Sequence, residues 1–183
     1  HIGLIADSET WLSVRTKLNS IVSRENSSSG WGKYTDDALT VGSPLTVAAG
    51  ATVNLTNNKG VVIESQLPQG TTTLYNGTRI TPDEALDVYT MNLTFKAKSS
   101  AHAGSFAITL DNSSSGDGSG IVFTKSASTV LAVNTEQDYS FTTTFPIDAT
   151  TKTNGGLLEI KSISGILSLY DFSIFIVKVH SAL

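Results

Sequence analysis

The segment "YTMNLTFKAK", residues 89–98, alternates apolar and polar side chains without interruption. Such a period of two matches a β-strand, in which successive side chains point to opposite faces of the sheet. An apolar face made this way has to be covered by a second layer. The alternation therefore predicts a half-buried strand in a layered β structure. Its inward residues are Tyr89, Met91, Leu93, Phe95 and Ala97.

Short segments of strand-forming residues recur along the rest of the chain. They are spaced by roughly the 8–12 residues that are typical of β-sandwiches. The expected strands are "SFAITLD", "IVFTK", "TVLAV", "DYSFTTTF" and "GLLEIKSIS", with earlier ones in "PLTVAAGATVNLTNNKGVVIESQ". Because no helices alternate with these strands, the pattern predicts an all-β, jelly-roll-like antiparallel β-sandwich over residues 30–183.

The last expected strand, "LYDFSIFIVKVH", is apolar on both faces. One face carries Phe172, Ile174 and Ile176, and the other carries Phe175, Val177 and Val179. A strand with one solvent-facing side should alternate with polar residues, so the second face needs a cover. Either another part of this chain or a second subunit can supply that cover.

Near the amino terminus, apolar residues follow helical instead of strand spacing. Trp11, Val14, Leu18 and Ile21 are separated by three, four and three residues, the a and d positions of a heptad. We call these four residues the heptad seam. Isolated helices shorter than about 12–15 residues are marginal in water. Residues 1–29 are therefore predicted to form a short helical stem or anchor, with linker, that packs against its own copies or another protein.

Composition excludes several classes of partner. The net charge of −4 comes from acidic and basic residues that are scattered without long runs, which argues against binding to nucleic acid or to a membrane surface. The chain contains no cysteine, so neither disulfides nor thiolate metal sites can form. No apolar segment reaches the length of roughly 18 residues that spans a bilayer.

No metal site or cofactor site is predicted. The loop "DNSSSGDGSG", residues 111–120, begins like a calcium loop, but Val122 stands where an EF-hand has its bidentate glutamate. A flexible hairpin tip is the better interpretation. His1, His102 and His180 are far apart in the sequence and show no metal-ligand spacing.

No catalytic residues are predicted, and the chain is interpreted as a non-enzyme. The acidic groups Asp36/Asp37 and Asp83/Glu84/Asp87 resemble glycosidase carboxylates only in type, and turn or cap roles explain them. The stretch from Thr81 to Glu84 has the pattern of a capping box and predicts one helical turn. No nucleophile elbow, phosphate-binding loop or dinucleotide fingerprint occurs.

A few residues are candidates for surface binding. Trp31 and Tyr34 are the aromatic residues expected to be partly exposed, and such rings can stack on sugars. Packing between helix and sandwich is the alternative role for Trp31. Asn112 and Asp117 belong to the Ser/Gly-rich loop, which could also contact a ligand.

The succession "SVRTKLNSI", "GWGKYTDD" and "SPLTVAAGATVNLTNN" resembles accessory virion proteins of tailed bacteriophages. "LYNGTRITPDEALDVYTMNLTFKAKSS" and "SLYDFSIFIVKVHSA" are similar to the same group, which includes head fibres, head decoration proteins and tail receptor-binding knobs. The shared motifs are structural, and together they cover most of the chain.

The resemblance implies a structural protein on the virion surface, in which a homotrimeric jelly-roll head is attached through the amino-terminal helix. The implied partners are further copies of the chain and the major capsid protein or another virion protein. The interface residues predicted from the sequence pattern are the heptad seam, together with Phe175, Val177 and Val179 on the second apolar face of the last strand. The alternative is a tail-associated receptor-binding protein that recognises a host surface glycan.

Overall fold

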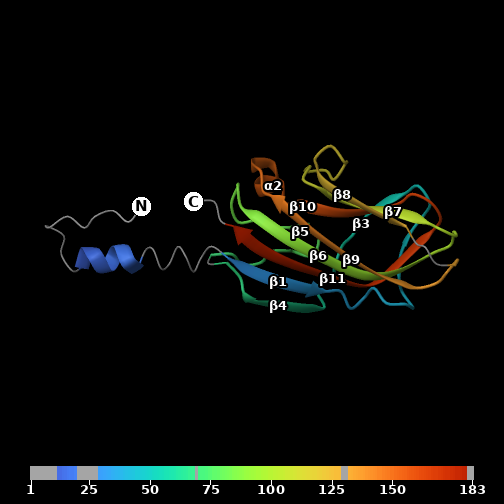
Figure 1. Ribbon diagram of the computed structural model, residues 1–183, viewed down its shortest axis with the longest axis horizontal. Helices are drawn as coiled ribbons and strands as arrows, with labels where there is room; N and C mark the ends of the chain where they lie inside the picture. Colours follow the sequence, from blue (N-terminus) through green and yellow to red (C-terminus); the bar gives the residue numbers. More distant parts are fainter. Residues whose placement is uncertain (1–11, 20–28, 69, 129–131, 181–183) are drawn as a thin grey trace.

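The computed structural model describes residues 12–19, 29–68, 70–128 and 132–180. Two antiparallel sheets lie face to face and form the sandwich that the alternating strands predict (Figure 1). The larger sheet has the order β4-β1-β11-β6-β9, with β2 also paired to β11. The smaller sheet has the order β3-β10-β7-β8, with β5 also paired to β10. The fold is an all-β, jelly-roll-like sandwich.

The larger sheet contains both the longest alternating strand and the doubly apolar one. Strand β11 pairs along most of its length with β6, and β6 pairs in turn with β9. Because β11 is last in the sequence but central in the sheet, distant parts of the chain are joined through it. The strands of this sheet are β1 (Gly30–Thr35), β2 (Leu45–Val47), β4 (Val61–Gln66), β6 (Val88–Ser99), β9 (Gln137–Pro146) and β11 (Leu167–His180).

The smaller sheet is built on β10, which pairs with β3, β5 and β7. Its strands are β3 (Thr52–Asn54), β5 (Arg79–Ile80), β7 (Ser105–Asp111), β8 (Ile121–Ser128) and β10 (Gly156–Ser162).

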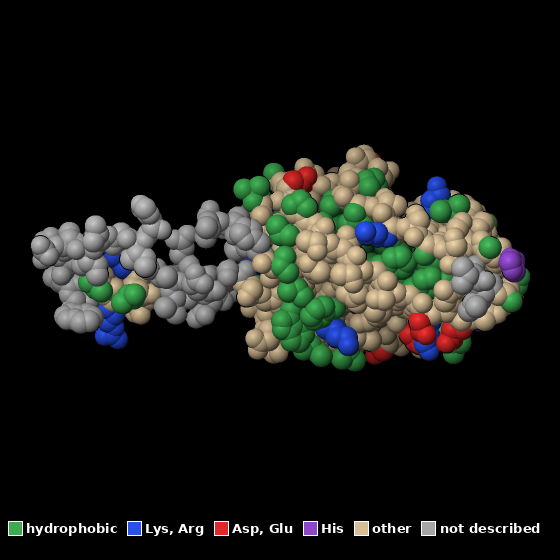
Figure 2. Space-filling view, in the orientation of Figure 1, with side chains coloured by type: hydrophobic (Ala, Val, Ile, Leu, Met, Phe, Trp, Pro, Cys, Tyr) green, Lys and Arg blue, Asp and Glu red, His purple; other side chains and the backbone are tan. Residues whose placement is uncertain are grey.

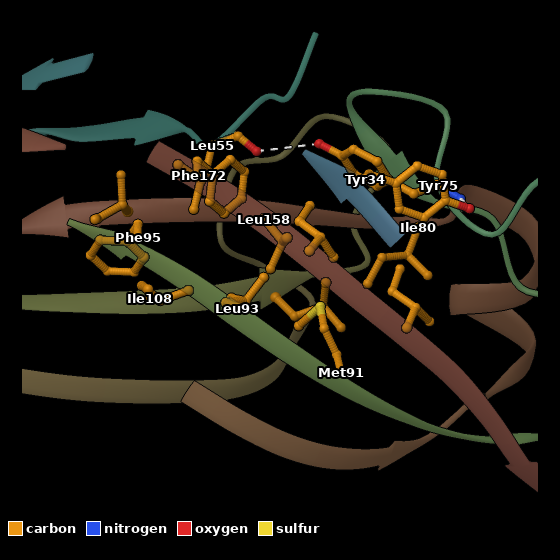
Figure 3. Close-up of a cluster of buried hydrophobic side chains, with 14 of the residues drawn as sticks. Tyr34, Leu55, Tyr75, Ile80, Met91, Leu93, Phe95, Ile108, Leu158 and Phe172 are labelled. Atoms are coloured by element: carbon orange, nitrogen blue, oxygen red, sulfur yellow. Dashed lines mark hydrogen bonds between the residues drawn. The ribbon is translucent and has the colours of Figure 1, made fainter. Parts of the chain in front are cut away.

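The core lies between the two sheets, where inward side chains from both meet (Figure 3). Phe95 of β6 contacts Phe106 of β7 edge to face, with ring centroids 5.9 Å apart. Met91, Leu93, Ile108 and Leu158 fill the same layer and are fully buried. The period-two interpretation of residues 89–98 is confirmed at each position, because the odd-numbered residues are buried and the even-numbered ones are half-buried.

Two local expectations are wrong. Residues 81–84 form no helical turn, because the Thr81 hydroxyl donates to the Thr73 carbonyl and the Glu84 amide donates to Asp87 instead. In the expected strand "TVLAV", Ala132 and Val133 belong to a turn closed by a hydrogen bond from the Thr135 amide to the Ala132 carbonyl. The first three residues of that segment lie outside the described residues.

One helix that follows β9 was not expected from the sequence. Helix α2 (Ala149–Asn154) is capped by Asp148, whose carboxylate accepts a hydrogen bond from the Thr151 amide. Its six residues are too few to show an apolar period, so only the cap could have indicated it. Near the amino terminus, residues 12–19 are helical, as the heptad spacing predicts. No helix among the described residues is long and apolar enough to cross a membrane.

Candidate interaction surface

The outer face of the larger sheet carries a group of exposed and half-buried apolar side chains. Successive residues of β11 alternate between the core and this face, so Phe175, Val177 and Val179 point outward together. Antiparallel pairing sets Trp31 of β1 opposite Val177, and Lys33 of β1 opposite both Phe175 and Ile63. We call the following set the apolar patch: Trp31, Val61, Ile63, Phe175, Val177 and Val179.

The apolar patch is a real surface feature and not a rim of the core. The Trp31 and Phe175 rings contact one another, with centroids 5.5 Å apart. Ile63 is 42% exposed and Val179 is 50% exposed. Figure 2 shows hydrophobic side chains gathered over β4, β1 and the end of β11. The exposed Lys33 lies on the same face, between Ile63 and Phe175. Apolar side chains gathered on an exposed face are a feature of interaction sites.

The neighbouring half of the same face, over β6 and β9, is polar and internally hydrogen-bonded. The Asn92 side-chain amide donates to the Ser140 hydroxyl at 3.0 Å and to the Thr142 hydroxyl at 2.8 Å. Thr90 and Thr144 share a further hydrogen bond of 2.8 Å. One sheet face therefore combines an apolar half with a half of satisfied hydroxyl and amide groups.

A shallow hollow of about 430 Å³ lies where the two halves meet. Trp31 and Phe175 supply its aromatic wall, while Asn92 and Ser173 supply polar groups. Lys33 is the charged residue beside it. The complete lining is Trp31, Lys33, Ile63, Asn92, Thr94, Ser173 and Phe175.

Tyr34 does not belong to this surface, and the expectation that it is exposed is wrong. Its side chain points to the core from β1 and is fully buried. The hydroxyl donates to Glu64 at 2.6 Å and accepts from the Leu74 amide at 2.9 Å. Burial, and next the hydrogen bond to Glu64, raise the pKa of Tyr34 to about 12. The strand period places Tyr34 and Trp31 on opposite faces, because they are an odd number of residues apart, and the packing of the sheet against its partner decides that Tyr34 faces the core.

The loop after β7 is ordered by the buried carboxylate of Asp111 and is not a loose hairpin tip. Its two oxygens accept from the Ser113 amide and hydroxyl, at 2.8 and 2.7 Å. They also accept from the amides of Gly118 and Gly120, at 2.9 and 3.2 Å. A side chain at Gly120 would collide with Asn112, so only glycine fits there. The carboxylate oxygens of Asp111 that would coordinate a cation instead accept hydrogen bonds from the loop.

The two loop residues that were candidates for surface binding differ in exposure. Asn112 is buried, and its side-chain amide donates to the Thr151 hydroxyl of α2 at 2.9 Å, so it is a structural residue. Asp117 is exposed. Hydrogen bonds from Ser119 and Ser115 hold the pKa of its carboxyl well below the ordinary range. Among the described residues, no three His, Asp or Glu side chains are placed to hold a metal ion.

The acidic groups that could imitate a glycosidase pair have structural contacts. Asp36 accepts hydrogen bonds from the amides of Ala38, Leu39 and Asn58, which closes a turn after β1. Asp83 and Asp87 both contact Lys178 of β11. Sequence reasoning missed this lysine, because a single Lys in an apolar strand gives no sign of which acids it will meet.

Part of the predicted heptad seam can be placed. Val14 is half-buried and Leu18 is 53% exposed, both within helix 12–19. Trp11 and Ile21 lie outside the described residues. The exposed Leu18 side chain has an apolar surface that is available to a partner.

No protein-family model and no curated protein matches this sequence. Solved structures do resemble the fold. The Eiger TNF of S. frugiperda aligns with a TM-score of 0.51 at 14% identity, covering 85% of this chain and 96% of its own. At that identity the likeness shows the fold alone, and it agrees with the jelly-roll sandwich described above.

Two viral proteins align less closely. The PRD1 vertex protein P5 has a TM-score of 0.48 at 14% identity, covering 85% of this chain and 74% of its own. A VP2 subviral particle of infectious bursal disease virus has a TM-score of 0.42 at 14% identity, covering 83% of this chain and 33% of its own.

Proposed function

We propose that this chain is a non-enzymatic structural protein on the surface of a tailed-bacteriophage virion. In this proposal the sandwich is the head of a homotrimeric decoration protein or head-fibre knob, and residues 1–29 attach it to the capsid. The observation that carries the proposal is the apolar patch on the larger sheet. The patch supports the proposal because the resemblance to phage accessory proteins implies a contact between copies, and such a contact requires an exposed apolar surface.

The chemistry of the patch suits contact between copies. Its side chains are aromatic and β-branched, and they project from adjacent strands of a rigid sheet. Burying such surface is favourable by roughly 25 cal/mol per Å² of apolar area removed from water. On the polar half, the hydroxyl and amide groups of Thr90, Asn92 and Thr144 already have hydrogen-bond partners. Within the patch, the exposed Lys33 is the charged group that a contact has to pair or leave in water.

Oligomeric state tests the proposal, with a matched pair of variants. Val179 of β11 and Ile121 of β8 are both 50% exposed β-branched residues, but only Val179 belongs to the patch. Val179→Asp buries an unpaired carboxylate in the contact. We expect association to weaken by at least about 2 kcal/mol, roughly thirtyfold in the association constant.

Sedimentation equilibrium and native mass spectrometry measure this effect directly. The wild-type chain and Ile121→Asp should be trimers at micromolar concentration, and Val179→Asp should dissociate. A wild-type chain that stays monomeric at this concentration contradicts the proposal.

The hollow beside Trp31 favours a second candidate function, a tail-associated protein that recognises a host surface glycan. An aromatic wall with an amide and hydroxyl groups at its edge offers stacking and hydrogen bonding to one sugar ring. A glycan array tests this candidate. Binding of a defined glycan by the wild-type chain supports it if Trp31→Ala abolishes the binding and Trp31→Phe preserves it. If the wild-type chain binds no glycan on the array, the glycan-recognition function is contradicted.

A further inference from the structure

Lys178 is a fully buried lysine placed between two carboxyl groups. It lies near the end of β11 on the inner face, opposite the apolar patch, and its side chain is 2% exposed. The amine nitrogen Nζ is 2.9 Å from Asp87 Oδ2 and 3.0 Å from Asp83 Oδ2. The Asp87 side chain is completely buried, whereas that of Asp83 is 29% exposed.

The surroundings of these groups are buried, and the backbone beside them is hydrogen-bonded. Lys178 is paired in register with Tyr89, and both Tyr89 and the neighbouring Ile176 are fully buried. The Tyr89 hydroxyl accepts from the Asp83 amide at 3.2 Å, which holds the segment before β6 in place. The Asp87 carbonyl accepts from the Ile147 amide at 2.8 Å. The Lys178 amine and the Asp87 carboxyl are thus held in contact away from solvent, with Asp83 as the partly exposed neighbour.

As an ion pair, this arrangement is costly. One ammonium and two carboxylates leave a net negative charge in a region of low dielectric, and the attraction within buried ion pairs often fails to repay their desolvation. Burial works to lower the pKa of Lys178, but hydrogen bonds with Asp87 and Asp83 outweigh it and raise the pKa. The amine therefore holds its proton in the resting state, and any reaction at nitrogen begins with proton transfer to a carboxylate.

We propose that Lys178 and Asp87 condense spontaneously into an intramolecular amide bond. The ammonium first passes one proton to the Asp87 carboxylate, giving a neutral amine beside a carboxylic acid. The lone pair of Nζ then attacks Cγ of Asp87, and a C–N bond forms. Asp83 takes the second amine proton and returns it to the departing Asp87 hydroxyl, which leaves as water.

The step is balanced without any other reactant. One ammonium and one carboxylate become one amide and one water molecule, and nothing is oxidised or reduced. Groups held in reacting geometry can behave as if present at effective concentrations of about 10⁵–10⁸ M. Asp83 fits the proton-relay role because it contacts the nitrogen and still reaches solvent, which also gives the released water a way out.

Asp87 fits the acceptor role because its carboxyl contacts Nζ and is completely buried. The bond would tie the end of β11 to the segment that precedes β6. This covalent closure does not depend on the proposed virion function and holds for any role of the head.

Mass spectrometry of the intact full-length chain under denaturing conditions tests the proposal. We expect a mass lower than the sequence mass by one water molecule, and a single cross-linked peptide containing Lys178 and Asp87. Lys178→Met and Asp87→Ala should both have the full mass expected from their sequences. Lys125→Met, which removes an exposed lysine of β8, is the matched control and should still lose one water.

Two further measurements separate this bond from other outcomes. Cyclisation of an aspartate with its own backbone also loses water, but it would persist in Lys178→Met and leave the two peptides unlinked. Asp83→Asn should slow the loss of water by about 10²–10⁴-fold, which is the usual contribution of a general acid–base catalyst. The rate is measured by following the intact mass over time in freshly expressed protein. A wild-type chain that is folded by circular dichroism and retains the full sequence mass overturns the proposal.

Discussion

The carboxylate of Asp111 organises the loop between β7 and β8 by accepting four hydrogen bonds from within it. Arg79 of β5 supports the same loop from outside, because its guanidinium donates to the carbonyls of Ser113 and Ser114, each at 3.1 Å. The sequence of this loop is rich in Gly and Ser and predicts flexibility. One buried charge at its base converts it into an ordered structure.

Replacing Asp111 should therefore destabilise the whole head. Asp111→Ala leaves the buried Ser113 and the amides of Gly118 and Gly120 without this acceptor, and we expect a loss of about 2–3 kcal/mol in the free energy of unfolding. Asp111→Asn keeps one acceptor oxygen and should lose less. Urea denaturation at neutral pH measures both variants, and equal stabilities for Asp111→Ala and wild type would contradict this role.

The same residue predicts a dependence on pH. Burial works to raise the pKa of Asp111, but the hydrogen bonds from Ser113, Gly118 and Gly120 outweigh burial and hold the pKa below its ordinary value of 3.8. A carboxyl whose pKa is lower in the folded state than in the unfolded state stabilises the folded protein fully at pH values above the unfolded-state pKa. This stabilisation is lost as the pH falls through the folded-state pKa. The difference in stability between wild type and Asp111→Ala should shrink correspondingly in acid.

At the scale of elements, the helix of residues 12–19 and strand β11 carry the exposed apolar side chains that the proposed function assigns to contacts with partners. Short isolated helices are marginal in water, so the proposed function has the exposed apolar residues of this helix make a contact outside it. Within it, Leu18 belongs to the heptad seam, whereas Leu12 does not, although Leu12 is even more exposed at 73%. This difference allows the proposed stem to be tested with one residue type.

Leu18→Asp should reduce attachment of the chain to virions at least tenfold, because it places a charge in the proposed seam. Leu12→Asp introduces the same charge on the same helix away from the seam and should have a small effect. Quantitative immunoblotting of purified particles measures the attached copies. Equal attachment for Leu18→Asp and wild type would remove the stem from the proposed function.

Element by element, the sequence predicted most strands because their inner faces are apolar at every second position. Strand β6 follows its alternation throughout, and β11 shows both of its apolar faces in the structure. The predictions were wrong where side chains form hydrogen bonds with backbone groups that a regular element would otherwise use. Thr81 is a residue type typical of helix caps, but its hydroxyl donates a hydrogen bond to the Thr73 carbonyl. The Glu84 amide donates to the Asp87 carboxylate.

At the scale of the whole molecule, one sheet face accounts for both candidate functions. The apolar patch favours contact between copies, while the hollow beside it favours a sugar ring. Because Trp31 and Phe175 belong to both, a self-contact that covers the patch would also occupy the hollow. Oligomeric state and glycan binding are therefore competing outcomes for one surface, and measuring both on the same preparation separates them.

The sequence by itself determined the class of fold, the helical character of residues 12–19 and the two apolar faces of the last strand. These features are local, since they depend on periods of two and of about 3.6 residues that any short window shows. Only the tertiary structure decided which faces meet and which remain open. It buried Tyr34, brought Trp31 to Phe175 and placed Lys178 between Asp83 and Asp87. These outcomes depend on residues that are far apart in the chain. The registers in which β11 pairs with β1 and β6 bring such residues together, and no short segment of sequence specifies those registers.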